Sequence, residues 1–282
     1  MSTPVRCAEL SELAGEPLDA TASTTQSWLL VEVPGTWSRD VSDGDGLPEA
    51  ARRSVRAWLE RTPSSRLLFI RRPGRSRDGR ELAFVVHASA SRSRIRRLEL
   101  AQLDDLDLDE AGIDETGSQL VLVCGHGTRD PCCVLRGMAV YGALVSSLRP
   151  EQVWISSHQG GHRFAANVLV LPSGVQLGRI SAAEAPAVVA EALAGRIELD
   201  HFRGRATYAP EVQAADMAVR RALGLQGIDD LHLVGADGGT VRFRDATGRE
   251  HVAIAERRSG PAVPASCGAD PEPQVAYSAR VV

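Results

Sequence analysis

The chain has 282 residues, 43% of them apolar, which suffices for one large domain or two moderate ones with a packed core. Its formal net charge of -4 provides no electrostatic footprint for a nucleic-acid backbone, so we expect no nucleic acid among its partners. No segment approaches the roughly 20 apolar residues of a membrane helix, and the first residues lack a secretion signal. We therefore expect a soluble, cytoplasmic protein without a membrane partner.

The sequence contains no lysine, so all 32 basic residues are arginines. Schiff-base catalysis and a Walker-type phosphate loop both need a lysine, and both are excluded. The five cysteines are an odd number in a chain without a secretory signal, so a framework of disulfides is not expected. The cysteines point instead to metal or redox chemistry, or to ordinary packing.

The first part of the chain reads as a strand, an amphipathic helix and three further strands. These elements are expected at residues 27–33, 48–61, 66–71, 82–87 and 94–98. An acidic segment at residues 104–115 then breaks the pattern and is expected to connect two parts of the chain. We therefore predict an N-terminal α/β lobe over residues 1–115.

The middle of the chain begins with a short apolar run at 119–123, which is typical of a buried parallel strand. A Gly-rich loop, a helix at about 134–148, strands at 153–156, 167–171 and 175–180, and a helix at 182–193 follow. This order predicts a thioredoxin-like core over residues 116–208. Because the N-terminal lobe has a similar order, a tandem of two related lobes is a further hypothesis.

The last part is predicted to be a small appended module over residues 209–282. It contains a helix at 211–223, strands near 231–234, 240–243 and 251–255, and a Pro-rich tail at 260–273. The predicted fold class is therefore α/β, with a thioredoxin-like core, an N-terminal α/β lobe and a small C-terminal appendage.

Two loops carry the cysteines and histidines that are candidate metal ligands. The first runs from Cys124 through Gly-His-Gly-Thr-Arg-Asp-Pro to Cys132 and Cys133, and the second is His158-Gln-Gly-Gly-His162. Each loop leaves the end of a predicted strand, and neighbouring strands lie about 4.8 Å apart, so both loops are expected at one edge of the sheet. The glycines let the backbone approach a bulky ligand. We therefore expect Cys124, Cys133, His158 and His162 to converge.

The spacing of these residues indicates which metal group they would bind. Eight residues separate Cys124 from Cys133, more than in a zinc knuckle, and this span suits a larger iron-sulfur cluster. Cys132 lies beside Cys133 and could replace it as a ligand. Two alternatives stay open: a zinc-stabilised interaction module with the same four ligands, and a thiol-based oxidoreductase in which Cys124 or Cys132 is the nucleophile.

These motifs resemble the sucrase/ferredoxin-like family, whose members have a thioredoxin-like ferredoxin domain. The resemblance rests on the Cys124 loop with Cys133, on His158-Gln-Gly-Gly-His162-Arg-Phe-Ala-Ala-Asn, and on residues 28–37, and it spans roughly residues 7–208. It implies that Cys124, Cys133, His158 and His162 bind a 2Fe-2S cluster. The family name suggests sugar hydrolysis, but the sequence contains no carboxylate pair in a recognisable glycosidase setting.

The resemblance implies a one-electron carrier or redox sensor rather than an enzyme with its own organic substrate, so no catalytic residue is assigned. Two neutral imidazoles in place of two thiolates remove roughly two negative charges, which makes the cluster easier to reduce. The outer imidazole nitrogens can exchange protons, so reduction is expected to be coupled to protonation. The expected partner is a redox protein, either a reductase or an electron acceptor.

Overall fold

A computed structural model of the chain describes residues 5–73, 80–88, 93–103 and 107–282. This part contains five α-helices, two short 3-10 turns (η) and fourteen strands. In chain order the elements are α1 (Cys7–Leu13), β1 (Ser27–Glu32), α2 (Glu49–Arg61), β2 (Ser65–Arg71), β3 (Leu82–His87), β4 (Arg94–Glu99), η1 (Leu100–Leu103), β5 (Ile113–Asp114), β6 (Leu120–Cys124), α3 (Pro131–Val145), β7 (Val153–Ser156), η2 (His162–Phe164), β8 (Val168–Leu171), β9 (Val175–Leu177), α4 (Ala185–Leu193), β10 (Phe202–Arg205), α5 (Pro210–Leu223), β11 (Leu231–Asp237), β12 (Thr240–Asp245), β13 (Glu250–Pro264) and β14 (Pro271–Val281).

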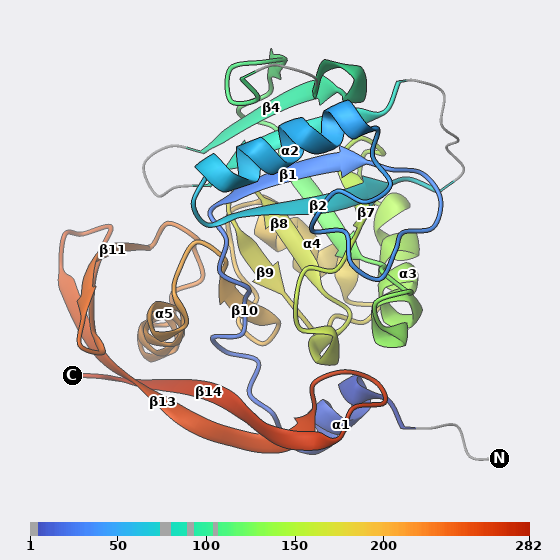
Figure 1. The fold of residues 1–282 in the computed structure, drawn as a ribbon. Helices are drawn as coiled ribbons and strands as arrows, with labels where there is room; N and C mark the ends of the chain where they lie inside the picture. Colours follow the sequence, from blue (N-terminus) through green and yellow to red (C-terminus); the bar gives the residue numbers. More distant parts are fainter. Residues whose placement is uncertain (1–4, 74–79, 89–92, 104–106) are drawn as a thin grey trace.

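Ten strands form one continuous sheet, in the order β10-β9-β8-β6-β7-β2-β1-β3-β4-β5 (Figure 1). In the middle of the chain, β6 pairs in parallel with β7 and antiparallel with β8, and β8 pairs antiparallel with β9. With α3 and α4 over the sheet, this is the thioredoxin-like core that the sequence predicts, and the fold class is confirmed. The order follows from the connections, because a helix links the parallel pair whereas a tight turn links the antiparallel hairpin.

The N-terminal strands repeat the connectivity of the core. Here β1 pairs in parallel with β2 and antiparallel with β3, and β3 pairs antiparallel with β4. The two sets meet where β2 pairs antiparallel with β7, through Ile70 opposite Ser156 and Arg71 opposite Ile155. The chain therefore carries two copies of one arrangement side by side in a single sheet. The domain boundaries at 115/116 and 208/209 stay a prediction.

The core lies on both faces of the large sheet. Along β1, Leu29 and Val31 belong to one hydrophobic cluster and Trp28 and Leu30 to another, as the alternation of side chains along a strand requires. The cluster that includes Leu29 also receives buried side chains from α2, α3 and α4. Burial on two faces explains why the central strands are continuous apolar runs.

The C-terminal region departs from its prediction. Residues 260–273 are predicted as a Pro-rich tail, but they form the end of β13, the turn at 265–270 and the start of β14. The two strands form a long hairpin that pairs up to Pro264 opposite Pro271. Its prolines are tolerated because Pro261 lies where the register shifts, and because β12 pairs with β13 only up to Ile254 among the described strands. Figure 1 shows the tip of this hairpin beside α1.

Several smaller differences concern short elements. The strand β10 and the seven-residue helix α1 are absent from the predicted elements. Residues 104–106 of the acidic segment lie outside the described residues, whereas Ile113–Asp114 forms β5 against β4. None of the helices in the described part is long and apolar enough to cross a bilayer. The cytoplasmic location stays a prediction.

Candidate metal centre

The ends of β6 and β7 place the two predicted loops side by side. Cys124 is the last residue of β6 and pairs with Ser156, the last residue of β7. The backbone N–H of Gly125 donates to the Ser156 carbonyl at 3.0 Å, which continues the pairing into the loop. The loop that carries His158 therefore starts beside the Cys124 thiol, as the strand-end argument predicts.

The helix α3 begins three residues earlier than the predicted start at 134. Asp130 is its N-cap and accepts the backbone N–H of Cys132 at 2.8 Å, and Pro131 occupies the first turn, where its missing N–H costs nothing. Cys132 and Cys133 thus both lie in the first helical turn. Successive helical residues point in directions about 100° apart, so the two thiols face different neighbours.

Three donor atoms form a compact group. The ligand atoms of Cys124, Cys133 and His158 lie within 4.8 Å of one another, with His158 Nδ1 3.8 Å from Cys133 Sγ. Both cysteines are buried. The hydrogen bond from the Cys133 thiol lowers the pKa of Cys124 well below its ordinary value and raises the pKa of Cys133 well above it. The Cys133 thiol therefore favours the thiolate form of Cys124, the form in which cysteine binds metals.

The fourth predicted residue, His162, lies next to this group. Its ring centroid is 4.9 Å from that of His158, and its Nε2–H donates to the Ala265 carbonyl. Its Nδ1 is buried and has no hydrogen-bond partner among the described residues. Burial lowers the pKa of His162, which favours the neutral imidazole that a metal ligand needs. An unsatisfied buried acceptor costs roughly 1–3 kcal/mol, and coordination to a metal would remove this cost.

Two arginines, the partly buried Arg66 and the buried Arg203, support the second loop. Arg66 donates to the carbonyls of His158 at 2.7 Å and Gln159 at 3.1 Å, and Arg203 donates to the carbonyl of Gly160 at 3.0 Å. Gly161 has a φ of +69°, and a Cβ there would come within 2.5 Å of Arg203 Nη2, so the loop requires glycine. Burial lowers the pKa of Arg203 to about 9. No sequence motif signals this role for either arginine.

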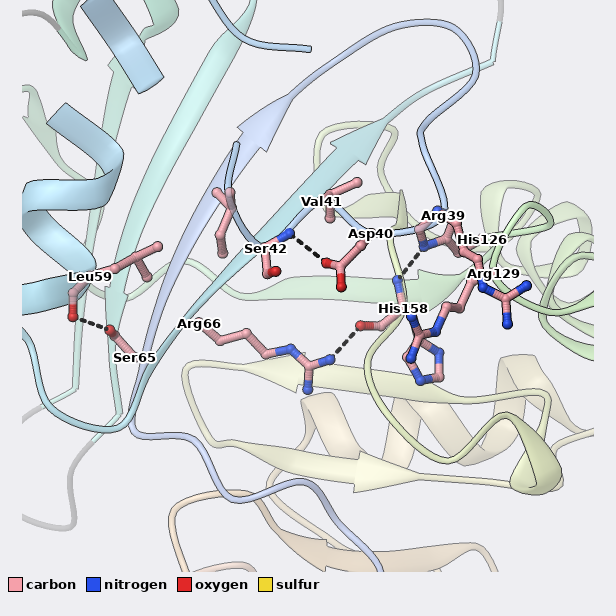
Figure 2. Close-up of a pocket in the computed structure, with 11 residues that line it drawn as sticks. Arg39, Asp40, Val41, Ser42, Leu59, Ser65, Arg66, His126, Arg129 and His158 are labelled. Carbon is pink, nitrogen blue, oxygen red and sulfur yellow. Dashed lines mark hydrogen bonds between the residues drawn. The ribbon is translucent and has the colours of Figure 1, made fainter. Parts of the chain in front are cut away.

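A cavity of about 380 Å³ opens beside His158 (Figure 2). Arg39, Arg66, Arg129 and His126 line it together with His158. The Nδ1 atom of His126 accepts the backbone N–H of His158 at 3.1 Å, and its Nε2–H donates to the Ser38 carbonyl at 2.8 Å. His158 is therefore held by its backbone, and its ring borders the cavity.

The four candidate ligands can be compared with the ligand sets that a 2Fe-2S cluster and a zinc ion require. Two buried thiols and two imidazoles lie together, and the Nδ1 atom of His162 is buried without a hydrogen-bond partner among the described residues. The set fits a 2Fe-2S cluster, which spreads its ligands over two irons. A single tetrahedral zinc ion needs all four donors equally close, whereas only three of them form the compact group among the residues described here.

Comparison with known proteins gives three findings. A family model described as sucrase/ferredoxin-like matches residues 18–204. Altered inheritance of mitochondria protein 32 from Debaryomyces hansenii is 31% identical over 100 residues, which cover 32% of this chain and only 37% of that protein. The thioredoxin-like 2Fe-2S ferredoxin from Aquifex aeolicus is 18% identical with a TM-score of 0.26, covering 30% of this chain and 88% of that one. Two cysteine-to-serine variants of it match with the same values over 97% of their chains.

Proposed function

Because the chain belongs to the sucrase/ferredoxin-like family, we propose that it binds a 2Fe-2S cluster and acts as a one-electron carrier or redox sensor. The proposed ligands are Cys124, Cys133, His158 and His162. When bound, a 2Fe-2S cluster takes up and releases single electrons. The observation that carries the proposal concerns the Nδ1 atom of His162. It is buried beside two buried thiols and a second imidazole, and it has no hydrogen-bond partner in the part of the chain that the structure describes.

The two histidines have different surroundings, which bears on proton coupling. The outer nitrogen of His162 donates to the Ala265 carbonyl, with Asp130 Oδ2 3.8 Å away, so its proton is held in place. The Nδ1 atom of His158 faces Cys133, and its ring borders the open cavity. We propose that reduction is coupled to protonation and that His158 is where the proton exchanges with solvent.

We also propose that the redox partner docks at this cavity. His158 is the one proposed ligand that lines it, together with three arginines. A donor or acceptor protein that approaches there comes closest to the centre, and an acidic surface would complement the arginines. A thiol-based oxidoreductase has less support, because Cys124 and Cys132 are each only 1% exposed and a substrate disulfide cannot reach them.

The test is a visible and electron paramagnetic resonance spectrum of the anaerobically purified full chain, before and after dithionite, with iron and acid-labile sulfide analysis. We expect about two irons and two sulfides per chain. Cys133→Ser should lose both, whereas Cys132→Ser is the matched control and should keep them. Folded protein that takes up no iron and sulfide on reconstitution would contradict the proposal. Zinc without sulfide at these four residues would favour the interaction module instead.

A further inference from the structure

Three cysteines far apart in the sequence meet at a second place, where α1, the start of α3 and the tip of the β13–β14 hairpin come together. The Sγ atoms of Cys7 and Cys132 are 3.5 Å apart, those of Cys132 and Cys267 are 3.4 Å apart, and those of Cys267 and Cys7 are 3.5 Å apart. Both carboxylate oxygens of Asp130 lie 3.8 Å from Cys7 Sγ. Cys7, Cys132 and Asp130 are buried, and Cys267 is partly exposed.

The distances favour a single metal ion over a disulfide. A disulfide brings two sulfurs to about 2.05 Å, but the three separations are nearly equal and favour no pair, and three thiols cannot all be paired. Zinc–sulfur bonds of about 2.3 Å in a tetrahedron place sulfurs about 3.8 Å apart, close to the observed triangle. A cluster that gives each thiolate its own iron would hold the sulfurs further apart.

We propose that Cys7, Cys132, Cys267 and Asp130 bind one structural Zn²⁺ ion, separate from the centre at Cys124. Three thiolates with one carboxylate suit zinc among the common divalent metals. Each Asp130 oxygen accepts one backbone N–H, from Cys132 at 2.8 Å and from Cys267 at 2.9 Å, and keeps a lone pair for the ion.

The surroundings of the site compensate its charge. Three thiolates and a carboxylate around Zn²⁺ leave a net charge of about -2. The backbone N–H groups of Cys132 and Cys267 donate to the Asp130 carboxylate and offset part of this charge. The positive end of the fifteen-residue helix α3 lies at the site, since Asp130 is its N-cap. These contacts are typical of the outer shell of a zinc–thiolate site.

The site would connect three segments that the large sheet does not hold together. Cys7 and Cys267 are separated by 260 residues, and both lie outside the region 18–204 that matches the family. Two residues before Cys267, the Ala265 carbonyl accepts the hydrogen bond from His162. A bound zinc ion therefore fixes the hairpin tip as a cover over one proposed ligand of the iron-sulfur centre.

The experiment is metal analysis of the full chain, purified anaerobically without chelator, together with circular dichroism as a check of folding. We expect about one zinc per chain beside the iron. Cys7→Ser and Cys267→Ser should lose the zinc and keep iron and sulfide, whereas Cys133→Ser should lose the iron and keep the zinc. Co²⁺ added to zinc-free protein should give thiolate-to-cobalt charge-transfer bands that are missing in Cys267→Ser.

A second measurement on the unchanged chain covers the case that a variant does not fold. Mass spectrometry after alkylation should find Cys7, Cys132 and Cys267 unreactive until a zinc chelator is added. The proposal is overturned by folded protein that contains no zinc and takes up neither Zn²⁺ nor Co²⁺, or by a disulfide between any two of the three cysteines. Zinc that is lost only in Cys133→Ser also overturns it, because the ion then belongs to the other centre.

Discussion

Cys132 and Cys133 are neighbours in the chain, yet their thiols belong to different groups of ligands. The Asp130-Pro131 start of α3 places both in the first helical turn, and the rotation of about 100° between successive residues separates them. Cys133 joins Cys124 and His158, whereas Cys132 joins Cys7 and Cys267. At the scale of single residues, one helix start thus serves two candidate metal sites.

The histidines offer a prediction at the same scale. His158→Cys adds a negatively charged ligand and removes the imidazole that borders the cavity, so we expect a lower midpoint potential and a flatter dependence on pH. His162→Cys should also lower the potential, but it should flatten the pH dependence less, because its outer nitrogen is held by Ala265. Potentials measured by redox titration across a pH series check this. A wild-type potential that does not change with pH would refute the coupling.

The Asp109 carboxylate is expected to stabilise the fold in a pH-dependent way. Burial alone would raise the pKa of Asp109, but hydrogen bonds from Trp58 at 3.0 Å and His87 at 2.8 Å outweigh it and lower the pKa below the ordinary 3.8. The pKa of Asp109 is lower in the folded than in the unfolded chain, so its ionised carboxylate stabilises the fold. This stabilisation is fully present above the unfolded pKa and is lost as the pH falls through the folded pKa.

Asp109→Asn should therefore destabilise the fold by about 1 kcal/mol at neutral pH. The difference from the wild type should shrink as the pH falls through and below the ordinary carboxyl range. Urea unfolding of both proteins at several pH values measures this. A difference that stays constant from neutral to acidic pH would show that the carboxylate charge plays no part.

At the scale of elements, the contact between α3 and the end of β6 determines how close the two cysteines of the first centre come. A Cβ added at Gly137 would lie 2.0 Å from the Cys124 carbonyl oxygen, so the helix can approach the strand only with glycine at this position. Cys133 lies one turn earlier on the same helix. The packing of α3 on β6 is therefore part of the geometry of the centre.

Gly137→Ala should push α3 away from β6, lower the melting temperature and reduce the iron retained per chain. Gly142→Ala in the same helix is the matched control, because a Cβ there meets nothing within 4 Å among the described residues. The control should be stabilised by roughly 0.5–1 kcal/mol, the usual gain of alanine over glycine inside a helix. Melting curves and iron analysis compare the two variants. Equal melting temperatures and iron contents would mean that the close approach of α3 to β6 is not needed for the centre.

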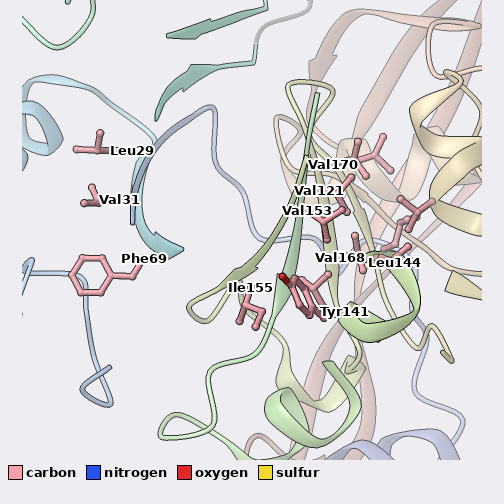
Figure 3. Close-up of a cluster of buried hydrophobic side chains, with 14 of the residues drawn as sticks. Leu29, Val31, Phe69, Val121, Tyr141, Leu144, Val153, Ile155, Val168 and Val170 are labelled. Carbon is pink, nitrogen blue, oxygen red and sulfur yellow. The ribbon is translucent and has the colours of Figure 1, made fainter. Parts of the chain in front are cut away.

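At the scale of the whole molecule, the two halves of the large sheet share one core. Figure 3 shows Leu29, Val31 and Phe69 from the N-terminal half on one side and Val121, Val153 and Ile155 from the central half on the other, all in one hydrophobic cluster. The sheet is continuous through the pairing of β2 with β7. Neither half therefore has an independent core on this face.

We expect the two halves to unfold together. Hydrogen exchange measured by mass spectrometry at increasing denaturant should show β1 and β6 losing protection at the same concentration, since cooperative units lose protection together. Loss of protection in β1 well before β6 would mean that the N-terminal lobe is a separate folding unit. That outcome would favour the predicted boundary at 115/116 as a true domain boundary.

Local sequence patterns predicted many of the strands and helices, and they predicted where the two loops of the Cys124 centre lie. Apolar runs and turn residues identify β3 and β7 at their observed bounds. The placement of Cys124 and His158 at the ends of neighbouring strands follows from the same signals, because strand ends and glycine loops depend on residues close in sequence. The Pro-rich segment misled the prediction, since proline is a poor strand residue except at edges and bulges, which sequence does not reveal.

The sequence by itself determined the α/β order and the two glycine loops that carry the candidate ligands, and the family resemblance implied four of their residues as cluster ligands. Only the tertiary structure decided that Cys133 and not Cys132 faces Cys124, that Arg66 and Arg203 support the second loop, and that Cys7 and Cys267 meet Cys132. The physical reason is distance along the chain. Contacts across 125 or 135 residues arise from how whole elements pack, and no local periodicity encodes that packing.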